Sequence, residues 1–84
     1  MAKIIKTDGT KIEVAPANGS DFSLEELQKV VGGYIEIVYL SEGRLMVVNE
    51  EGWLNNLPYN PSASEIYGHP IVGDVLICER KQIK

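Results

Sequence analysis

The sequence lacks most of the features that define the common functional classes of small protein. It contains one cysteine, Cys78, which cannot form an internal disulfide, and this fits a reducing cytoplasm. Its apolar runs are only four or five residues long, whereas a bilayer-spanning helix needs roughly 20. The first residues also lack the basic and apolar regions of a secretory signal. We therefore expect a cytoplasmic protein with no membrane segment.

Patterns for metal binding and catalysis are missing as well. His69 is the single histidine, and no C-x-x-C or H-x-x-x-H spacing supplies a set of metal ligands. No glycine-rich phosphate loop is present, and the adjacent Glu50 and Glu51 are expected to be solvated in a turn. The catalytic alternatives are a general acid/base role for Glu50 or Glu51 and a Cys78–His69 nucleophile pair. The sequence thus predicts a protein that is not an enzyme and uses no metal or other cofactor.

Length and charge set further bounds. The 84 residues, 44% apolar and 24% charged, indicate a single domain over residues 1–84. The net charge of −4 argues against direct binding of nucleic acid. The charge is uneven, because residues 12–79 hold eleven acids against Lys29 and Arg44, whereas both ends of the chain are basic. If the two ends lie side by side, they form a small basic patch; solvated basic ends are the simpler interpretation.

The first half of the chain contains a hairpin and a helix. Residues 3–6 and 11–14 flank Asp8-Gly9, a signal for a two-residue type I′ turn, which would place Ile5 opposite Ile12 and Lys6 opposite Lys11. A helix follows at residues 24–31. Ser23 and Glu26 form the capping-box pattern at its start, and Gly32 suits a left-handed end.

The second half repeats this order and adds a strand. Residues 34–40 and 44–49 form a β-rich hairpin around a three-residue loop, with Ile37 opposite Val47. Asn60-Pro61 opens a short helix that Gly68 ends, and residues 75–79 form a last strand. The order β-β-α-β-β-α-β predicts a compact α+β domain with a mainly antiparallel sheet and two short helices; we expect helices on one face of the sheet.

Amide and aromatic side chains gather between the fourth strand and the second helix. Amides donate and accept hydrogen bonds, aromatic rings stack on planar groups, and helix N-terminal amides attract anions. This combination suits a nucleotide-like small molecule; alternatively, the asparagines only stabilise turns. Two residues of the second hairpin, Tyr34 and Glu36, lie on its mixed face, and Arg44 offers a positive charge. The candidate ligand-binding residues are therefore Asn49, Trp53, Tyr59, Asn60, Arg44, Tyr34 and Glu36.

Four segments carry a resemblance to a known family. They are Gly33-Tyr34-Ile35-Glu36, Val48-Asn49-Glu50-Glu51-Gly52, Leu57-Pro58-Tyr59-Asn60-Pro61 with Ala63, and Gly73-Asp74-Val75-Leu76-Ile77. The chain resembles an uncharacterised domain-of-unknown-function family of small proteins from phages, other mobile elements and Firmicute-type bacteria. The family pattern marks Asn49 and Asn60 but implies no reaction and no ligand.

The phage association suggests a function that the residues alone do not. Phages carry small accessory proteins that bind host products, so we expect an anti-defence binding protein that sequesters a nucleotide-like host immune signal. A chain this short gains a deep pocket by forming a homo-oligomer. The alternative is an acidic inhibitor that mimics nucleic acid and binds a host DNA- or RNA-binding protein.

Overall fold

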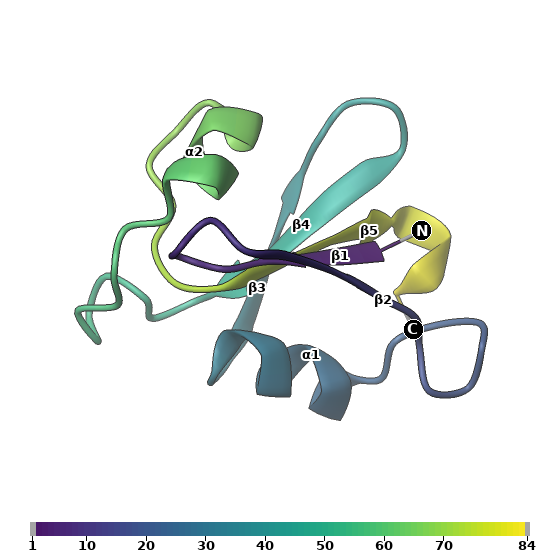
Figure 1. Ribbon diagram of the computed structural model, residues 1–84. Helices are drawn as coiled ribbons and strands as arrows, with labels where there is room; N and C mark the ends of the chain where they lie inside the picture. The colour runs from purple at the N-terminus through teal and green to yellow at the C-terminus, as the bar shows by residue number, and fades with distance from the viewer. Residues whose placement is uncertain (1, 84) are drawn as a thin grey trace.

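The computed structural model describes residues 2–83 and confirms the predicted order of elements (Figure 1). A short 3₁₀ turn, η1, which the sequence did not predict, follows the last strand. The elements are β1 (Ala2–Ile5), β2 (Lys11–Val14), α1 (Leu24–Val31), β3 (Ile35–Tyr39), β4 (Arg44–Asn49), α2 (Pro61–Tyr67), β5 (Val75–Glu79) and η1 (Arg80–Gln82).

The five strands form one sheet in the order β2-β1-β5-β4-β3, and every neighbouring pair is antiparallel. The last strand, β5, therefore enters the middle of the sheet between β1 and β4. This insertion joins the two hairpins and places the start of the chain beside its end, because Lys3 pairs with Ile77.

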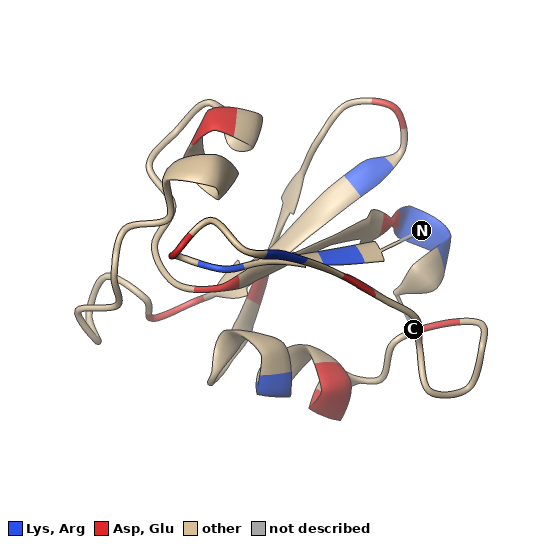
Figure 2. Ribbon diagram, in the orientation of Figure 1, with Lys and Arg blue, Asp and Glu red and all other residues tan. Residues whose placement is uncertain are grey.

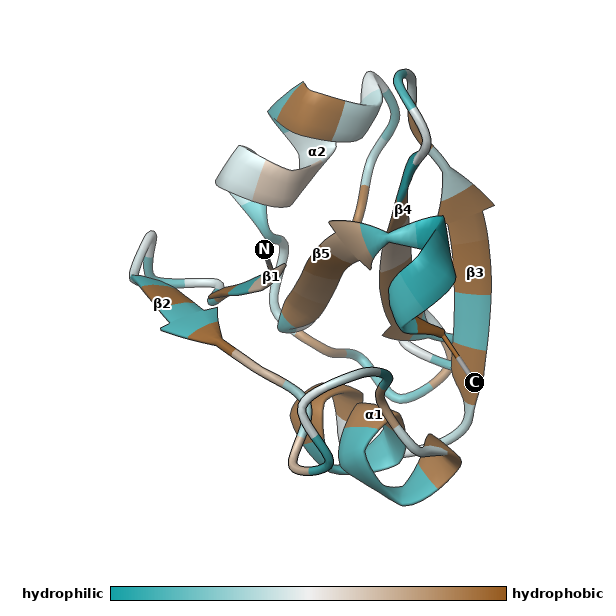
Figure 3. Cartoon of the chain, turned by 90° about the vertical axis from the view of Figure 1, so that its right-hand side faces the viewer, coloured by the Kyte–Doolittle hydropathy of each residue, from teal (hydrophilic) through white to brown (hydrophobic). Residues whose placement is uncertain are grey.

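Helices cover both faces of the sheet, so the expectation that they lie on one face is wrong. Helix α1 lies below the sheet in Figure 1 and α2 lies above it. Each face consequently has its own core: Leu27 and Val31 pack with Val47 and Leu76 on the α1 side. On the α2 side, Ala63 packs with Met46. The strands β4 and β5 are buried on both faces, which explains why they are almost continuously hydrophobic (Figure 3).

Local signals at α1 are confirmed. The Glu26 amide donates to Ser23 Oγ at 3.2 Å, and the Ser23 amide donates to Glu26 Oε1 at 2.9 Å, which completes the capping box. Gly32 ends the helix at φ +80°. A helix of eight residues is too short to persist alone, and it is held here by packing on β3, β4 and β5.

The two hairpins differ in how well their register was predicted. In β3–β4 the expected pairs are present, including Ile37 with Val47. In β1–β2 the register is shifted by one residue: Ile4 pairs with Ile12 and Ile5 pairs with Lys11. A shift of one residue changes which side chains of the two strands share a face.

The cause of this shift is the size of the first turn. The Lys6 amide donates to Thr10 O at 2.9 Å and Asp8 Oδ1 accepts from the Thr10 amide at 2.8 Å, so the loop holds three residues, with Gly9 at φ +92°. The observed register avoids the unfavourable Lys6–Lys11 pair and places Lys3 opposite Glu13.

Candidate functional site

Asn60, the N-cap of α2, has a structural role. Its side chain is 0% exposed. The amide nitrogen donates to Ile5 O at 3.0 Å and to Gly73 O at 2.9 Å, and Oδ1 accepts from the Ala63 amide at 3.0 Å. Both N–H groups are used and no surface remains for a ligand, so the prediction that Asn60 contacts one does not fit its burial.

Asn49 is engaged in a similar way at the end of β4. Its Nδ2 donates to Val31 O at the end of α1 at 3.0 Å, and its Oδ1 accepts from the Glu51 amide at 2.8 Å. Gly33 lies close by: a Cβ added there would be 3.1 Å from Asn49 Nδ2, so a larger residue would require this amide to shift by a few tenths of an ångström. The Asn49 amide thus links α1 to the turn after β4.

The loop after β4 presents two large apolar side chains to solvent. Trp53 is 67% exposed and Leu54 is 76% exposed. The backbone below them is ordered by hydrogen bonds from Asn55 N to Glu51 O at 2.8 Å and from Leu57 N to Gly52 O at 3.0 Å. Leu57 also packs against Gly73, where an added Cβ would lie 2.8 Å from Leu57 Cδ1. The loop backbone that carries the exposed Trp53 and Leu54 side chains is therefore held in one conformation.

Beside this loop lies a cavity of about 210 Å³, which we call the Trp53 recess. The side chains of Glu36 and Glu50 give it two carboxylates, and Trp53 and Tyr67 give it two aromatic rings. No Lys or Arg in the described part of the chain lines it. The lining residues are Glu36, Val38, Val48, Asn49, Glu50, Trp53, Tyr67, Pro70, Ile71 and Val72.

The recess unites three of the seven candidate residues, namely Glu36, Asn49 and Trp53. Tyr34 is exposed at the same end of the β3–β4 hairpin, where its carbonyl accepts from the Glu50 amide. Tyr59 is exposed too and bridges Val72, but it does not line the recess.

Arg44 lies apart from this group, because it starts β4 whereas Asn49 ends it. Five residues of extended strand span about 17 Å. Arg44 instead borders a second cavity, of about 180 Å³, on the other side of α2, which we call the basic cavity. It is lined by Lys3, Ile5, Lys11, Arg44, Ile66 and Ile77.

The sequence analysis did not identify the basic cavity. Its one signal was the charge asymmetry of the chain, since Lys3 and Lys11 come from the basic start. The sheet order was needed to join them to Arg44, because β1 lies beside β5 and β5 beside β4. Blue segments on β1, on β2 and at the start of β4 mark these cations in Figure 2.

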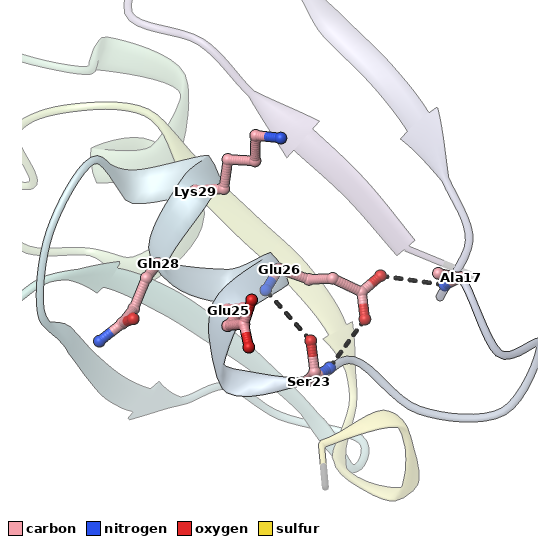
Figure 4. A pocket seen from close by; sticks show the side chains of 6 residues that line it. All are labelled: Ala17, Ser23, Glu25, Glu26, Gln28 and Lys29. Atoms are coloured by element: carbon pink, nitrogen blue, oxygen red, sulfur yellow. Dashed lines mark hydrogen bonds between the residues drawn. The ribbon is translucent and has the colours of Figure 1, made fainter.

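A wide groove follows α1 on the opposite face of the sheet. Its largest section, about 640 Å³, is lined by Ala17, Ser23, Glu25, Glu26, Gln28 and Lys29 (Figure 4). Backbone amides of Ser23 and Ala17 donate to the Glu26 carboxylate, and they lower its pKa below the ordinary value of 4.5. In the next section Lys6 lies 3.9 Å from Asp74. Charges of both signs line the groove, so it favours no class of ligand.

The geometry does not support a Cys78–His69 nucleophile pair. Cys78 is buried among the residues of the α1-side core, and this desolvation raises the pKa of its thiol to about 11. His69 is exposed after α2 and lies against Tyr67, with ring centroids 5.2 Å apart. The two side chains thus belong to opposite faces of the sheet. Within residues 2–83 no three His, Cys, Asp or Glu side chains are grouped closely enough to hold a metal ion.

The chain belongs to the family described as "Domain of unknown function (DUF3846)", whose model matches residues 1–83. Comparison with curated proteins and with solved structures gives no match. No helix in the described region is both long enough and apolar enough to cross a bilayer.

Proposed function

We propose that the chain is a non-enzymatic binding protein that recognises a partner protein with a basic surface. The contact surface is the exposed loop with the carboxylates around it. We call it the Trp53 surface: Trp53, Leu54, Glu36, Glu50 and Glu51. This is the second of the two functions expected from the sequence, the acidic inhibitor of a DNA- or RNA-binding protein.

The observation that carries this proposal is the exposure of Trp53 beside an acidic recess. Tryptophan is among the residues that contribute most to binding at protein interfaces, where the strongest contacts are central aromatic side chains. Leu54 extends the apolar area, and the hydrogen-bonded loop below holds both side chains in place. A preorganised surface loses little conformational entropy on binding.

The charge around Trp53 selects the class of partner. Glu36 and Glu50 line the recess and Glu51 is exposed next to it. A phosphate group would be repelled there, whereas a lysine or arginine side chain would be attracted. Proteins that bind nucleic acid carry such side chains in clusters, so mimicry of nucleic acid is consistent with this surface.

A capture experiment tests the proposal. The immobilised protein should retain a basic partner from host lysate, and about 0.5 M salt should release it, because exposed charges are screened at that ionic strength. Trp53 is the single tryptophan, so its fluorescence can then be titrated with the purified partner.

Variants make this experiment specific. Trp53→Ala removes the fluorescent reporter, so its affinity is measured by calorimetry alongside that of the wild type; it should weaken binding by at least tenfold. Glu36→Gln combined with Glu50→Gln should slow association. The matched control is Tyr39→Ala, an exposed aromatic residue at the other end of β3. Equal affinity of the wild type and Trp53→Ala would refute the proposal.

The other expected function, sequestration of a nucleotide-like host signal, has one specific observation in its favour. The rings of Trp53 and Tyr34 are exposed at one end of the β3–β4 hairpin and could stack on a base. The recess, at about 210 Å³, is smaller than ordinary ligand pockets of roughly 300–1,000 Å³, so this function requires a homo-oligomer that completes the site. Calorimetric titration with cyclic nucleotides and ADP-ribose derivatives, together with sedimentation, tests it; a monomer without heat of binding would exclude it.

A further inference from the structure

The second cavity beside α2 has the opposite character to the Trp53 recess. Residues from four strands and α2 surround it: Lys3 and Ile5 from β1, Lys11 from β2, Arg44 from β4, Ile77 from β5 and Ile66 from α2. Its cations come from distant parts of the sequence, and the antiparallel order of the strands places them around one opening of about 180 Å³.

The concentration of positive charge is unusual for this protein. The whole chain has eight Lys and Arg residues against twelve Asp and Glu, yet three of these eight cations and none of the carboxylates line the cavity. Two carboxylates lie next to it, because Glu13 pairs with Lys3 and Glu79 pairs with Arg44 in the strand register. Glu79 is also 3.5 Å from Lys81. The residues that line the cavity are therefore positively charged or apolar, and the cations attract an anion.

The floor and one wall of the cavity are apolar. Ile5 and Ile77 are buried beneath the cations, and Ile66 of α2 is 40% exposed above them. A fully hydrated inorganic anion would leave these isoleucines without contact. An anion that carries a short aliphatic group would cover them and gain from the burial of apolar area.

We propose that the basic cavity is a binding site for a small phosphate monoester with an aliphatic substituent. The Arg44 guanidinium donates two N–H groups in a fork that matches two phosphate oxygens. Lys3 and Lys11 supply point charges for the rest of the phosphate. The substituent lies on Ile66 and Ile77. The site is separate from the Trp53 surface, since α2 stands between the two cavities and contributes Ile66 to one and Tyr67 to the other.

Titration followed by amide NMR tests this site with defined probes. The probes are butyl phosphate, inorganic phosphate, butyrate and butylammonium. Butyl phosphate should shift the amide signals of residues 3, 5, 44, 66 and 77 with a Kd of about 1 mM, typical of a ligand this small. Inorganic phosphate should bind more weakly because it lacks the aliphatic group, and butyrate should bind more weakly because it lacks the phosphate. Butylammonium, a cation, should produce no shifts.

Two kinds of variant separate the charged from the apolar contacts. Arg44→Gln and Lys3→Gln should each weaken butyl phosphate about tenfold through the loss of a charge-assisted contact. Ile66→Ala should weaken butyl phosphate while leaving inorganic phosphate unchanged. The matched control is Lys29→Gln, a cation of α1 on the opposite face of the sheet, which should bind as the wild type does.

Three results would overturn the proposal. The first is the absence of shifts with butyl phosphate at about 10 mM, ten times the expected Kd. The second is an equal loss of binding in Lys29→Gln and Arg44→Gln, which would indicate a general effect of net charge. The third is equal binding of phosphate and butyl phosphate in wild type and Ile66→Ala, which would leave the isoleucines without a role.

Discussion

The asparagines of this protein differ in their surroundings: some are buried and hydrogen-bonded within the fold, and others are exposed to solvent. Asn60 donates to the carbonyls of Ile5 and Gly73 and caps α2, whereas Asn55 is exposed on the loop near Trp53. Throughout residues 2–83, no buried side-chain nitrogen or oxygen lacks a hydrogen-bond partner. Within this range, the buried side-chain polar atoms are thus all used by contacts inside the fold.

Replacement of Asn60 should be costly for this reason. Asn60→Ala removes an N-cap, worth about 1 kcal/mol, and leaves two buried carbonyls without their donor. We expect a loss of about 3 kcal/mol in the free energy of unfolding, measured by urea titration with an unchanged m-value. Asn55→Ala is the control and should change stability by less than about 0.5 kcal/mol. A loss of similar size in both variants would contradict the structural role of Asn60.

Gly52 is a second residue whose identity is required by a close contact. An added Cβ would lie 2.7 Å from Cγ2 of the buried Val72, below any normal separation. Gly52→Ala should destabilise the protein by about 1–3 kcal/mol, because the neighbouring side chain must move. In the Val72→Ala background the same change should cost much less, and thermal unfolding of the four proteins in this double-mutant cycle measures the difference. Strict additivity would show that the contact is not the cause.

At the scale of elements, the start of α1 links stability to pH. Two backbone amides lower the pKa of Glu26 below 4.5, so the ionised carboxylate stabilises the folded state. This stability is complete above pH 4.5, the ordinary value, and it is lost as the pH falls through the lower, folded pKa. Glu26→Gln should therefore flatten the decline in melting temperature below pH 4.5. Glu25→Gln, in the same helical turn, should leave that decline as it is in the wild type.

The elements also show what local sequence can predict. The capping box of α1, the glycine ends of both helices and the β3–β4 register depend on residues within one or two turns, and all were predicted. The β1–β2 register failed because a two-residue and a three-residue loop share the Asp8-Gly9 signal. In the observed register Ile4 pairs with Ile12, and Ile4 packs on the apolar face that α1 covers. Contacts between segments that are distant in the sequence determine which residues form that face and where α2 packs. Local sequence signals therefore do not predict either feature.

For the whole molecule, the candidate site was harder to predict than the fold. The two carbonyls to which the Asn60 side chain donates lie 55 and 13 residues away in sequence, so a free amide nitrogen and a satisfied one look the same in the sequence. The basic cavity needs four strands in their final order before its cations meet. Trp53 belongs to the cluster of candidate residues named from the sequence, and its side chain is exposed on a loop held by backbone hydrogen bonds.

The two cavities lie on the same face of the sheet, and their charged lining residues have opposite signs. Carboxylates line the recess on one side of α2, and cations line the cavity on its other side. A protein partner at the first site and a phosphate monoester at the second would use separate residues, so Trp53→Ala and Arg44→Gln should each affect one binding event alone. The net charge of −4 hides this division, which is why charge placement is more informative here than total charge.

The central position of β5 gives a last prediction about the molecule as a unit. Cys78 is 1% exposed on a strand bonded on both sides, and burial raises the pKa of its thiol to about 11. Its reaction with a thiol reagent at pH 8 should therefore require global unfolding and should accelerate with urea along the full equilibrium m-value. In a Ser20→Cys variant the added thiol, on an exposed loop, should react at once and without dependence on urea. Fast labelling of Cys78 without denaturant would mean that β5 leaves the sheet by local opening, and the two-hairpin sheet would then not behave as one cooperative unit.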